Sequence, residues 1–359
     1  MKHYKKYNSN TLAGTASQSW FESDGNVTKS IVLLKITNGG RYNYSLTYSN
    51  TIDSTFADGC HSRVNKVLDE WKIHSLKVGR CKECDMNSFS EIYDIKDMYF
   101  NGEKHKTVNP GEIFHTDETS IEFEKGEYIA IIMEFSGCQL PCHEEAQYPT
   151  FVMENGKYKP NKHTPVPVMT GCDRIATKKL GFFGDSITQG IGPTPNSYTH
   201  YVAVLSKKLS DEYSYWDIGI GFARASDAAS DGAWALKAKS VDIITVCFGV
   251  NDILMNGAKA KDIVINALET IVKYLKAENI KVILQTVPPF DYNEEQTKVW
   301  NEINEYILNN MKEKVDLIFD VRPILSGDRP ETAKFGGHPN EEGSELWGIA
   351  LAKAMQTLL

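Results

Sequence analysis

The sequence predicts an all-β domain followed by an α/β domain with a mostly parallel sheet. The chain has 359 residues, more than a single hydrophobic core usually supports. Its first part holds short strand-like segments separated by turns, whereas apolar runs alternate with helix-like segments from about residue 178 onward. The 41% hydrophobic and 24% charged content is typical of a globular protein. We place the domains at residues 1–165 and 175–359.

The N-terminal domain is expected to be a jelly-roll-like β-sandwich. Turn-forming sequences such as NGG at 38–40 and NPG at 109–111 separate segments rich in β-branched and aromatic residues. Segment 155–171 holds three prolines and no periodicity, which indicates a linker or a strap between the domains. The expected strands include Ser30–Thr37, Tyr42–Tyr48, Thr119–Glu124 and Tyr128–Phe135.

The C-terminal domain is expected to contain βαβ units, because strand-length and helix-length segments alternate. Sheets built this way bind ligands beyond the carboxyl ends of their strands. The expected strands are 180–184, 213–219, 242–249, 281–287 and 316–321. The expected helices are 197–209, 230–239, 259–276, 293–314 and 341–358.

The first of these strands ends in the segment GDSITQG, residues 184–190. A serine between glycines at a strand-to-loop turn presents its hydroxyl at the carboxyl edge of the sheet. A serine hydroxyl becomes a good nucleophile only when a neighbouring base accepts its proton. A helix-capping serine in an ordinary βα turn would explain the segment alone, so the other strand ends decide whether Ser186 is catalytic.

Three later segments supply the remaining parts of an acyl-transfer site. The segment GIGF at 219–222 ends the second strand, where a glycine leaves its N–H open to a substrate oxygen. Asn251 follows the third strand with a side-chain amide, and His338 precedes the last helix. Acyl transfer needs a nucleophile, a base and donors aimed at the developing oxyanion. A parallel sheet brings these strand ends together. The supporting residues expected beside them are Asp185, Gly249, Asp252 and Asn340.

These four segments resemble the conserved blocks of the SGNH, or GDSL-type, hydrolase superfamily, and they follow the same order along the C-terminal half. The resemblance implies a flavodoxin-like three-layer α/β/α domain. It also implies Ser186 as nucleophile and His338 as base, with an oxyanion hole formed by the N–H groups of Ser186 and Gly221 and the amide of Asn251. No cofactor is expected.

The sequence departs from the superfamily pattern at two positions. Phe335 stands where an aspartate usually orients the histidine. Either a backbone carbonyl orients His338, giving a Ser–His dyad, or a carboxylate such as Asp328 or Glu331 does so; we favour the dyad. The second departure is Phe222, which follows Gly221 where many relatives have another glycine.

The plan of a small β-sandwich ahead of the hydrolase domain is similar to that of certain carbohydrate acetylesterases. The expected substrate is therefore a small acyl ester, acetyl in the first instance, on a small molecule or saccharide. The sequence also lacks a long apolar lid segment suited to a lipid chain. Two alternatives stay open: a non-catalytic carbohydrate-binding protein with a vestigial hydrolase domain, and an acyltransferase that uses the same residues.

Charge and hydropathy limit the expected partners and location. The formal net charge of -8 argues against nucleic acid or an anionic membrane as the main partner. No segment approaches the roughly 18 apolar residues of a membrane-spanning helix. The basic N-terminal residues precede no apolar run, so we expect a cytoplasmic protein. Homo-oligomerisation stays open.

The chain contains seven cysteines, an odd number that favours reduced thiols over a disulfide framework. Two pairs have the spacing of half-sites for structural zinc. We expect no metal, and keep zinc as the less favoured alternative. The four cysteines in question are Cys81, Cys84, Cys138 and Cys142.

Overall fold

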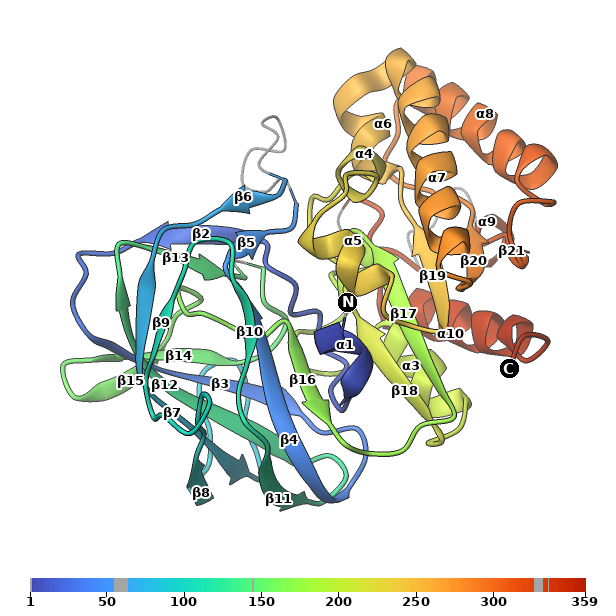
Figure 1. The fold of residues 1–359 in the computed structure, drawn as a ribbon. Coiled ribbons are helices and arrows are strands. Elements are labelled where there is room, and N and C mark those ends of the chain that lie inside the picture. Colours follow the sequence, from blue (N-terminus) through green and yellow to red (C-terminus); the bar gives the residue numbers. More distant parts are fainter. Residues whose placement is uncertain (1, 55–63, 144, 326–331, 335) are drawn as a thin grey trace. The chain divides into compact units, whose positions relative to one another are not determined.

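A computed structural model describes residues 2–54, 64–143, 145–325, 332–334 and 336–359 of the chain (Figure 1). The chain divides into two compact units. Residues Met1–Asp53 and Asn65–Ala176 form the first, here called the strand-rich unit. Residues Ser54–Val64 and Thr177–Leu359 form the second, here called the α/β unit.

The strand-rich unit contains two main antiparallel sheets. One is seven-stranded, in the order β15 (Lys157–Pro160), β14 (Thr150–Glu154), β3 (Thr28–Lys35), β12 (Tyr128–Gly137), β7 (Trp71–Cys81) and β8 (Ile92–Asp97), with β9 (Lys106–Val108) paired to β7. The other is five-stranded, in the order β1 (Asn8–Ser9), β16 (Met169–Cys172), β4 (Gly40–Ser49) and β10 (Ile113–His115), with β11 (Thr119–Phe123) paired to β4. Smaller elements are α1 (Lys2–Lys6) and the pairs β2 (Ser19–Glu22) with β13 (Gln139–Cys142) and β5 (Thr51–Ile52) with β6 (Lys66–Val67).

One core joins the two main sheets, and it contains Leu34 of β3, Tyr44 of β4 and Ile131 of β12. Successive side chains of a strand point to opposite faces. The neighbours Ala130 of β12 and Ile31 of β3 accordingly belong to a second apolar cluster. The seven-stranded sheet therefore carries apolar side chains on both faces, which is unusual for an antiparallel sheet with one face toward solvent.

The expected N-terminal strands are present as β3, β4, β11 and β12. The interpretation of segment 155–171 as a linker is wrong for two parts of it. Residues Lys157–Pro160 form the edge strand β15, and Met169–Cys172 form β16 between β1 and β4. β16 pairs with β1 and β4, which are distant in sequence, so local periodicity does not reveal it. β15 instead forms a hairpin with the preceding strand β14 across Asn155 and Gly156, a local turn signal that the sequence reasoning missed. The jelly-roll connectivity stays a prediction.

The α/β unit has a parallel five-stranded sheet in the order β18 (Tyr213–Asp217), β17 (Lys178–Gly184), β19 (Ile243–Cys247), β20 (Lys281–Gln285) and β21 (Leu317–Phe319). Numbered along the chain this order is 2-1-3-4-5, which is the flavodoxin-like arrangement. The expected fold class is confirmed. The helices are α2 (Ser186–Gln189), α3 (Tyr201–Lys208), α4 (Ala225–Ala228), α5 (Ala233–Ala238), α6 (Val250–Asn256), η1 (Gly257–Lys259), α7 (Ala260–Ala277), α8 (Glu294–Asn310), α9 (Arg322–Leu325) and α10 (Glu341–Met355).

Helices cover both faces of the parallel sheet (Figure 1). On one face Tyr201 of α3 stacks on Trp347 of α10 at 4.3 Å, and the Trp347 indole donates to Gln285 of β20. On the other, Phe183 of β17 meets Trp234 of α5 edge-on at 4.6 Å. With both faces covered, the carboxyl edge is where polar side chains can meet a ligand. No helix among the described residues is both long and apolar enough to span a bilayer.

Candidate active site

The nucleophile turn lies at the end of β17, where Ser186 is the first residue of α2. Asp185 is the N-cap residue, and its Oδ1 accepts the Ile187 N–H at 3.1 Å. Gly184 permits the tight approach of strand and helix, because a Cβ there would lie 2.0 Å from Thr188 Oγ1. The turn therefore holds the half-buried Ser186 at the carboxyl edge of the sheet.

Ser186 and His338 are in hydrogen-bond contact, with 2.9 Å between Ser186 Oγ and His338 Nε2. This distance suits transfer of the hydroxyl proton to the imidazole. A β-bridge between Ala333 and Pro339 and a 2.8 Å hydrogen bond from Lys334 N–H to His338 C=O shape the histidine segment. The imidazole also meets the Phe290 ring edge-on at 5.1 Å. The structure thus brings together two residues that are 152 positions apart.

The loop after α2 packs directly against the histidine segment. Gly192 has a φ of 121°, and a Cβ there would lie 2.1 Å from Pro339 C=O. The Thr194 N–H and hydroxyl donate to Glu341 Oε1 at 2.8 and 2.9 Å. Asn340 is the N-cap of α10 and accepts the Gly343 N–H at 2.9 Å. Sequence reasoning identified Asn340 but missed Gly192, Thr194 and Glu341, since nothing in their local sequence indicates this contact.

The choice between a Ser–His dyad and a triad is not decided by these contacts. Phe335, Asp328 and Glu331, on which that choice depends, lie outside the described residues. The dyad stays a prediction.

The expected oxyanion donors belong to two neighbouring loops. The buried Gly221 N–H donates to Gln189 Oε1 of α2, a residue that sequence reasoning did not single out. Asn251 Nδ2 donates to Ala223 C=O at 2.9 Å, and a primary amide carries a second N–H. Between these loop residues Phe222 has a φ of 60° and is 40% exposed, a backbone conformation that bulky residues rarely adopt.

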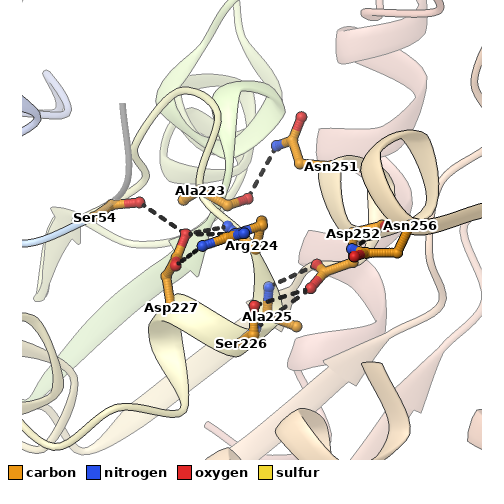
Figure 2. A network of polar contacts seen from close by, with 9 residues as sticks. All are labelled: Ser54, Ala223, Arg224, Ala225, Ser226, Asp227, Asn251, Asp252 and Asn256. Atoms are coloured by element: carbon orange, nitrogen blue, oxygen red, sulfur yellow. Dashed lines mark hydrogen bonds and ion pairs between the residues drawn. The ribbon is translucent and has the colours of Figure 1, made fainter. Parts of the chain in front are cut away.

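Asn251 and Asp252, adjacent on α6, hold the loop that carries Gly221 (Figure 2). While Asn251 binds Ala223, Asp252 Oδ2 accepts the Ala225 N–H at 2.8 Å. Asp252 Oδ1 also accepts from the Ser226 hydroxyl at 3.3 Å. The amide expected to stabilise an oxyanion is therefore linked to the loop that carries the second expected donor.

A partly buried ion pair lies in the same loop. The Arg224 guanidinium lies 2.8 Å from Asp227 Oδ1, and the Arg224 N–H donates to Asp227 Oδ2 at 3.0 Å (Figure 2). The Ser54 hydroxyl donates to Asp227 Oδ2 at 3.4 Å.

At the start of α6, Gly249 has a φ of 128°. A Cβ there would lie 2.8 Å from a Val287 methyl group.

Three buried carboxyl groups near the strand ends have raised pKa values. Burial, together with a smaller contribution from the nearby Asp252, raises the pKa of Asp185 to about 7. Burial likewise raises the pKa of Asp252 to about 6 and that of Asp217 well above its ordinary value. Asp217 Oδ2 lies 3.6 Å from His200 Nε2, whose pKa burial lowers to about 4. Such perturbed groups cluster at functional sites.

The four cysteines whose spacing is that of zinc half-sites are not gathered into a metal-binding group in the described part of the chain. Within the described residues no group of three or more histidine, cysteine or acidic side chains is arranged to hold a metal ion. Cys81 lies buried on β7, where its thiol contacts Glu83 C=O at 3.3 Å. Cys142 is buried on β13, whereas Cys138 is exposed and Cys84 is half-buried.

A flavodoxin-like sheet with serine, amide and histidine at its carboxyl edge is the arrangement expected of an SGNH-type hydrolase. Residues 182–346 match the family described as GDSL-like Lipase/Acylhydrolase. The α/β unit therefore contains a GDSL-like lipase/acylhydrolase domain, the domain of SGNH-type ester hydrolases. A comparison with curated proteins finds no match.

Solved structures of esterases are similar to this chain. An active-site mutant of a family two carbohydrate esterase from Clostridium thermocellum is 12% identical, covers 98% of this chain and 97% of its own, and has a TM-score of 0.43. A catalytic mutant of an acetylxylan esterase from Geobacillus stearothermophilus is 20% identical. The match covers 51% of this chain and 95% of that esterase, with a TM-score of 0.43. A GDSL-like lipase from Bacteroides thetaiotaomicron is 21% identical. The match covers 51% of this chain and 89% of that lipase, with a TM-score of 0.41.

Proposed function

We propose that the protein hydrolyses a small acyl ester with Ser186 as nucleophile and His338 as general base. Ser186 Oγ attacks the ester carbonyl while His338 Nε2 accepts the hydroxyl proton. The imidazolium then donates that proton to the leaving alcohol, and an acyl-serine forms. Water attacks the acyl-serine with His338 again as base, which releases the carboxylic acid and restores Ser186.

The negative charge that develops on the carbonyl oxygen is stabilised by donors on two loops. The Ser186 N–H and the second N–H of Asn251 serve this role directly. The Gly221 N–H joins them when the substrate oxygen replaces Gln189 Oε1, its present acceptor. Such fixed donors are effective because they need little reorganisation during the reaction.

The proposed substrate is an acetyl or similarly small acyl group on a carbohydrate. The sequence contains no long apolar lid segment, and a lipid chain would need such a surface. The exposed Phe222 side chain follows Gly221 directly, where many SGNH relatives have a glycine. An aromatic side chain beside an expected oxyanion donor favours a short acyl group.

The observation that carries this proposal is the 2.9 Å contact between Ser186 Oγ and His338 Nε2. The test is hydrolysis of p-nitrophenyl acetate, butyrate and octanoate by the wild type, Ser186→Ala and His338→Ala. Loss of the nucleophile or of the base from such a catalytic pair lowers turnover on the order of a million-fold. The half-buried Ser210 and the exposed His105 provide matched controls as Ser210→Ala and His105→Ala, which should retain full activity.

Activity that favours acetate and disappears in both site variants would support the proposal. Activity that survives in Ser186→Ala would place the nucleophile elsewhere. No activity of the wild type above the two variants would favour the carbohydrate-binding alternative. Product analysis with a competing alcohol separates hydrolysis from acyl transfer.

A further inference from the structure

The strand-rich unit has a hollow of about 630 Å³ that none of the proposed catalytic residues lines. Its volume lies within the range of small-molecule binding sites. Strands β3, β12, β7 and β8 form the floor (Figure 1), and β15 and the segment between β7 and β8 contribute to one end. The face that carries the hollow is the one opposite the core shared by the two sheets.

The strand register places the floor side chains in two rows. Ile132 of β12 pairs with Ile31 of β3 and with Lys77 of β7, and Lys77 pairs in turn with Asp97 of β8. In the second row Glu134 of β12 is the neighbour of residues on both β3 and β7. A β-bulge follows Glu134, and bulges often redirect side chains beside functional sites. Side chains of the sheet thus form the floor of the hollow, and Phe89 and Lys104 from the connecting segments also line it.

One end of the hollow is apolar and aromatic. Phe89 and Tyr158 meet edge-on with 5.8 Å between ring centroids, and both are half-buried. Ile92 lies beside them, and Ile95 is 50% exposed on the same strand. An antiparallel sheet normally presents polar side chains to solvent on its outer face. These residues leave an apolar surface that a ligand can cover.

The other end carries charges that are paired with one another. Lys29 lies 3.4 Å from Glu134, while Asp97 lies 3.6 Å from Lys77 and 2.6 Å from Lys104. This end thus contains three lysines and two carboxylates, so ammonium donors and carboxylate acceptors are both present. A lipid tail would desolvate these charges. Because the lysines are paired with carboxylates, their attraction for an anionic ligand is weakened.

We propose that this hollow is a binding site for a neutral oligosaccharide. A sugar ring has an apolar C–H face that packs on an aromatic or aliphatic side chain, and hydroxyl groups that both donate and accept hydrogen bonds. The Phe89–Tyr158 end suits the first property, and the Lys29–Glu134 and Asp97–Lys104 pairs suit the second. The inference does not rest on the proposed hydrolytic function, because it uses only the strand-rich unit.

The test measures binding of cellohexaose, xylohexaose and mannohexaose to the full chain carrying Ser186→Ala, by calorimetry and affinity electrophoresis. This background prevents turnover from obscuring binding. We expect at least one oligosaccharide to bind, and Tyr158→Ala and Glu134→Gln to weaken it about tenfold or more, as removal of a central contact residue does. The matched variants Trp20→Ala and Glu122→Gln change an aromatic and a glutamate outside the hollow and should bind like the parent.

Binding that persists in both hollow variants places the oligosaccharide elsewhere, for example in the hydrolase cleft, and overturns the proposal. Absence of binding by all three probes, or preference for a sulfated oligosaccharide, overturns it as well. Urea unfolding of Tyr158→Ala, in the same Ser186→Ala chain, reports whether that variant folds. If the variant is unfolded, Glu134→Gln, which keeps the shape of the side chain, decides the question alone. A failure here leaves the esterase result unaffected, since the two measurements use different residues.

Discussion

The pKa values of buried acidic groups are shifted in opposite directions in the two units. In the α/β unit Asp185, Asp217 and Asp252 lie buried near the strand ends with raised pKa values. In the strand-rich unit, burial also acts to raise the pKa of Glu127, but hydrogen bonds from Tyr93, Glu124 and Arg80 outweigh it and the pKa is lowered.

The difference follows from the two kinds of sheet. A parallel sheet covered by helices excludes water from its edge, so a carboxylate there loses hydration and receives few compensating donors. Glu127 is also buried, but it is hydrogen-bonded by Arg80, Tyr93 and the Glu124 N–H, which compensate for its lost hydration. The contrast therefore lies between three sparsely compensated carboxyl groups near the strand ends of the α/β unit and one fully paired carboxylate in the strand-rich unit.

Among the substitutions that test this comparison, the largest effect is expected from removing a fixed donor at the edge of the parallel sheet. Asn251→Ala should lower kcat by about 10²–10³-fold, the usual effect of losing an oxyanion donor, and it also releases Ala223. Esterase kinetics on p-nitrophenyl acetate provide the measurement. The exposed Asn266→Ala on α7 is the control and should leave kcat unchanged. A wild-type kcat in Asn251→Ala would remove this residue from the oxyanion hole.

The second prediction concerns Asp185, whose pKa is about 7 in the folded protein and about 4 in an unfolded chain. Between these two pKa values the carboxyl group of residue 185 is ionised in the unfolded chain but still protonated in the folded protein. The free energy of unfolding therefore falls as pH rises, and this effect levels off above about pH 7. Asp185→Asn keeps a good N-cap but cannot ionise. The variant should gain on the order of a few kcal/mol relative to wild type between about pH 4 and pH 8.

Urea unfolding across that pH range measures the gain of Asp185→Asn. The exposed Asp211→Asn serves as the control and should follow the wild-type profile. A difference between wild type and Asp185→Asn that does not change with pH would contradict the raised pKa.

The strand-rich unit should show the reverse dependence on pH. Glu127 is 6% exposed and accepts from Arg80 Nη2 at 2.7 Å and from the Glu124 N–H at 2.7 Å. Glu127→Gln should cost about 1–3 kcal/mol at neutral pH, because charged hydrogen bonds are weakened. A lowered pKa contributes stability above the unfolded value of about 4.3 that is lost as pH falls through the folded value. The cost should therefore shrink in acid, and a cost that grew there would contradict the assignment.

The smallest effect is expected where an acidic group stays in solvent. Arg41 and Glu122 lie 2.6 Å apart, with side chains 64% and 55% exposed. Glu122→Gln should change the free energy of unfolding by less than about 1 kcal/mol, and added salt should reduce that further. Urea unfolding at low and high salt is the measurement. An effect as large as that of Glu127→Gln would mean that burial does not set the difference between these pairs.

Local sequence patterns predicted most of the framework of the α/β unit. Strand-length apolar runs and helix-length segments alternate, and β17, β19 and β20 all fall inside expected strands or within two residues of them. Ser186, Asn251 and His338 were identified because each directly follows a strand or precedes a helix. Such patterns are readable because helices and buried strands have distinct periods and lengths.

The sequence by itself therefore determined the order of elements and the edge of the sheet at which the chemistry is expected. Only the tertiary structure decided which partners meet there: Gln189 with Gly221, Gly192 with Pro339, and Asp252 with the loop at Ala225. It also decided that Met169–Cys172 lies as β16 between β1 and β4. Strand pairing, close backbone approach and the desolvation that raises the pKa of Asp185 depend on residues distant in the chain, and local sequence carries no record of them.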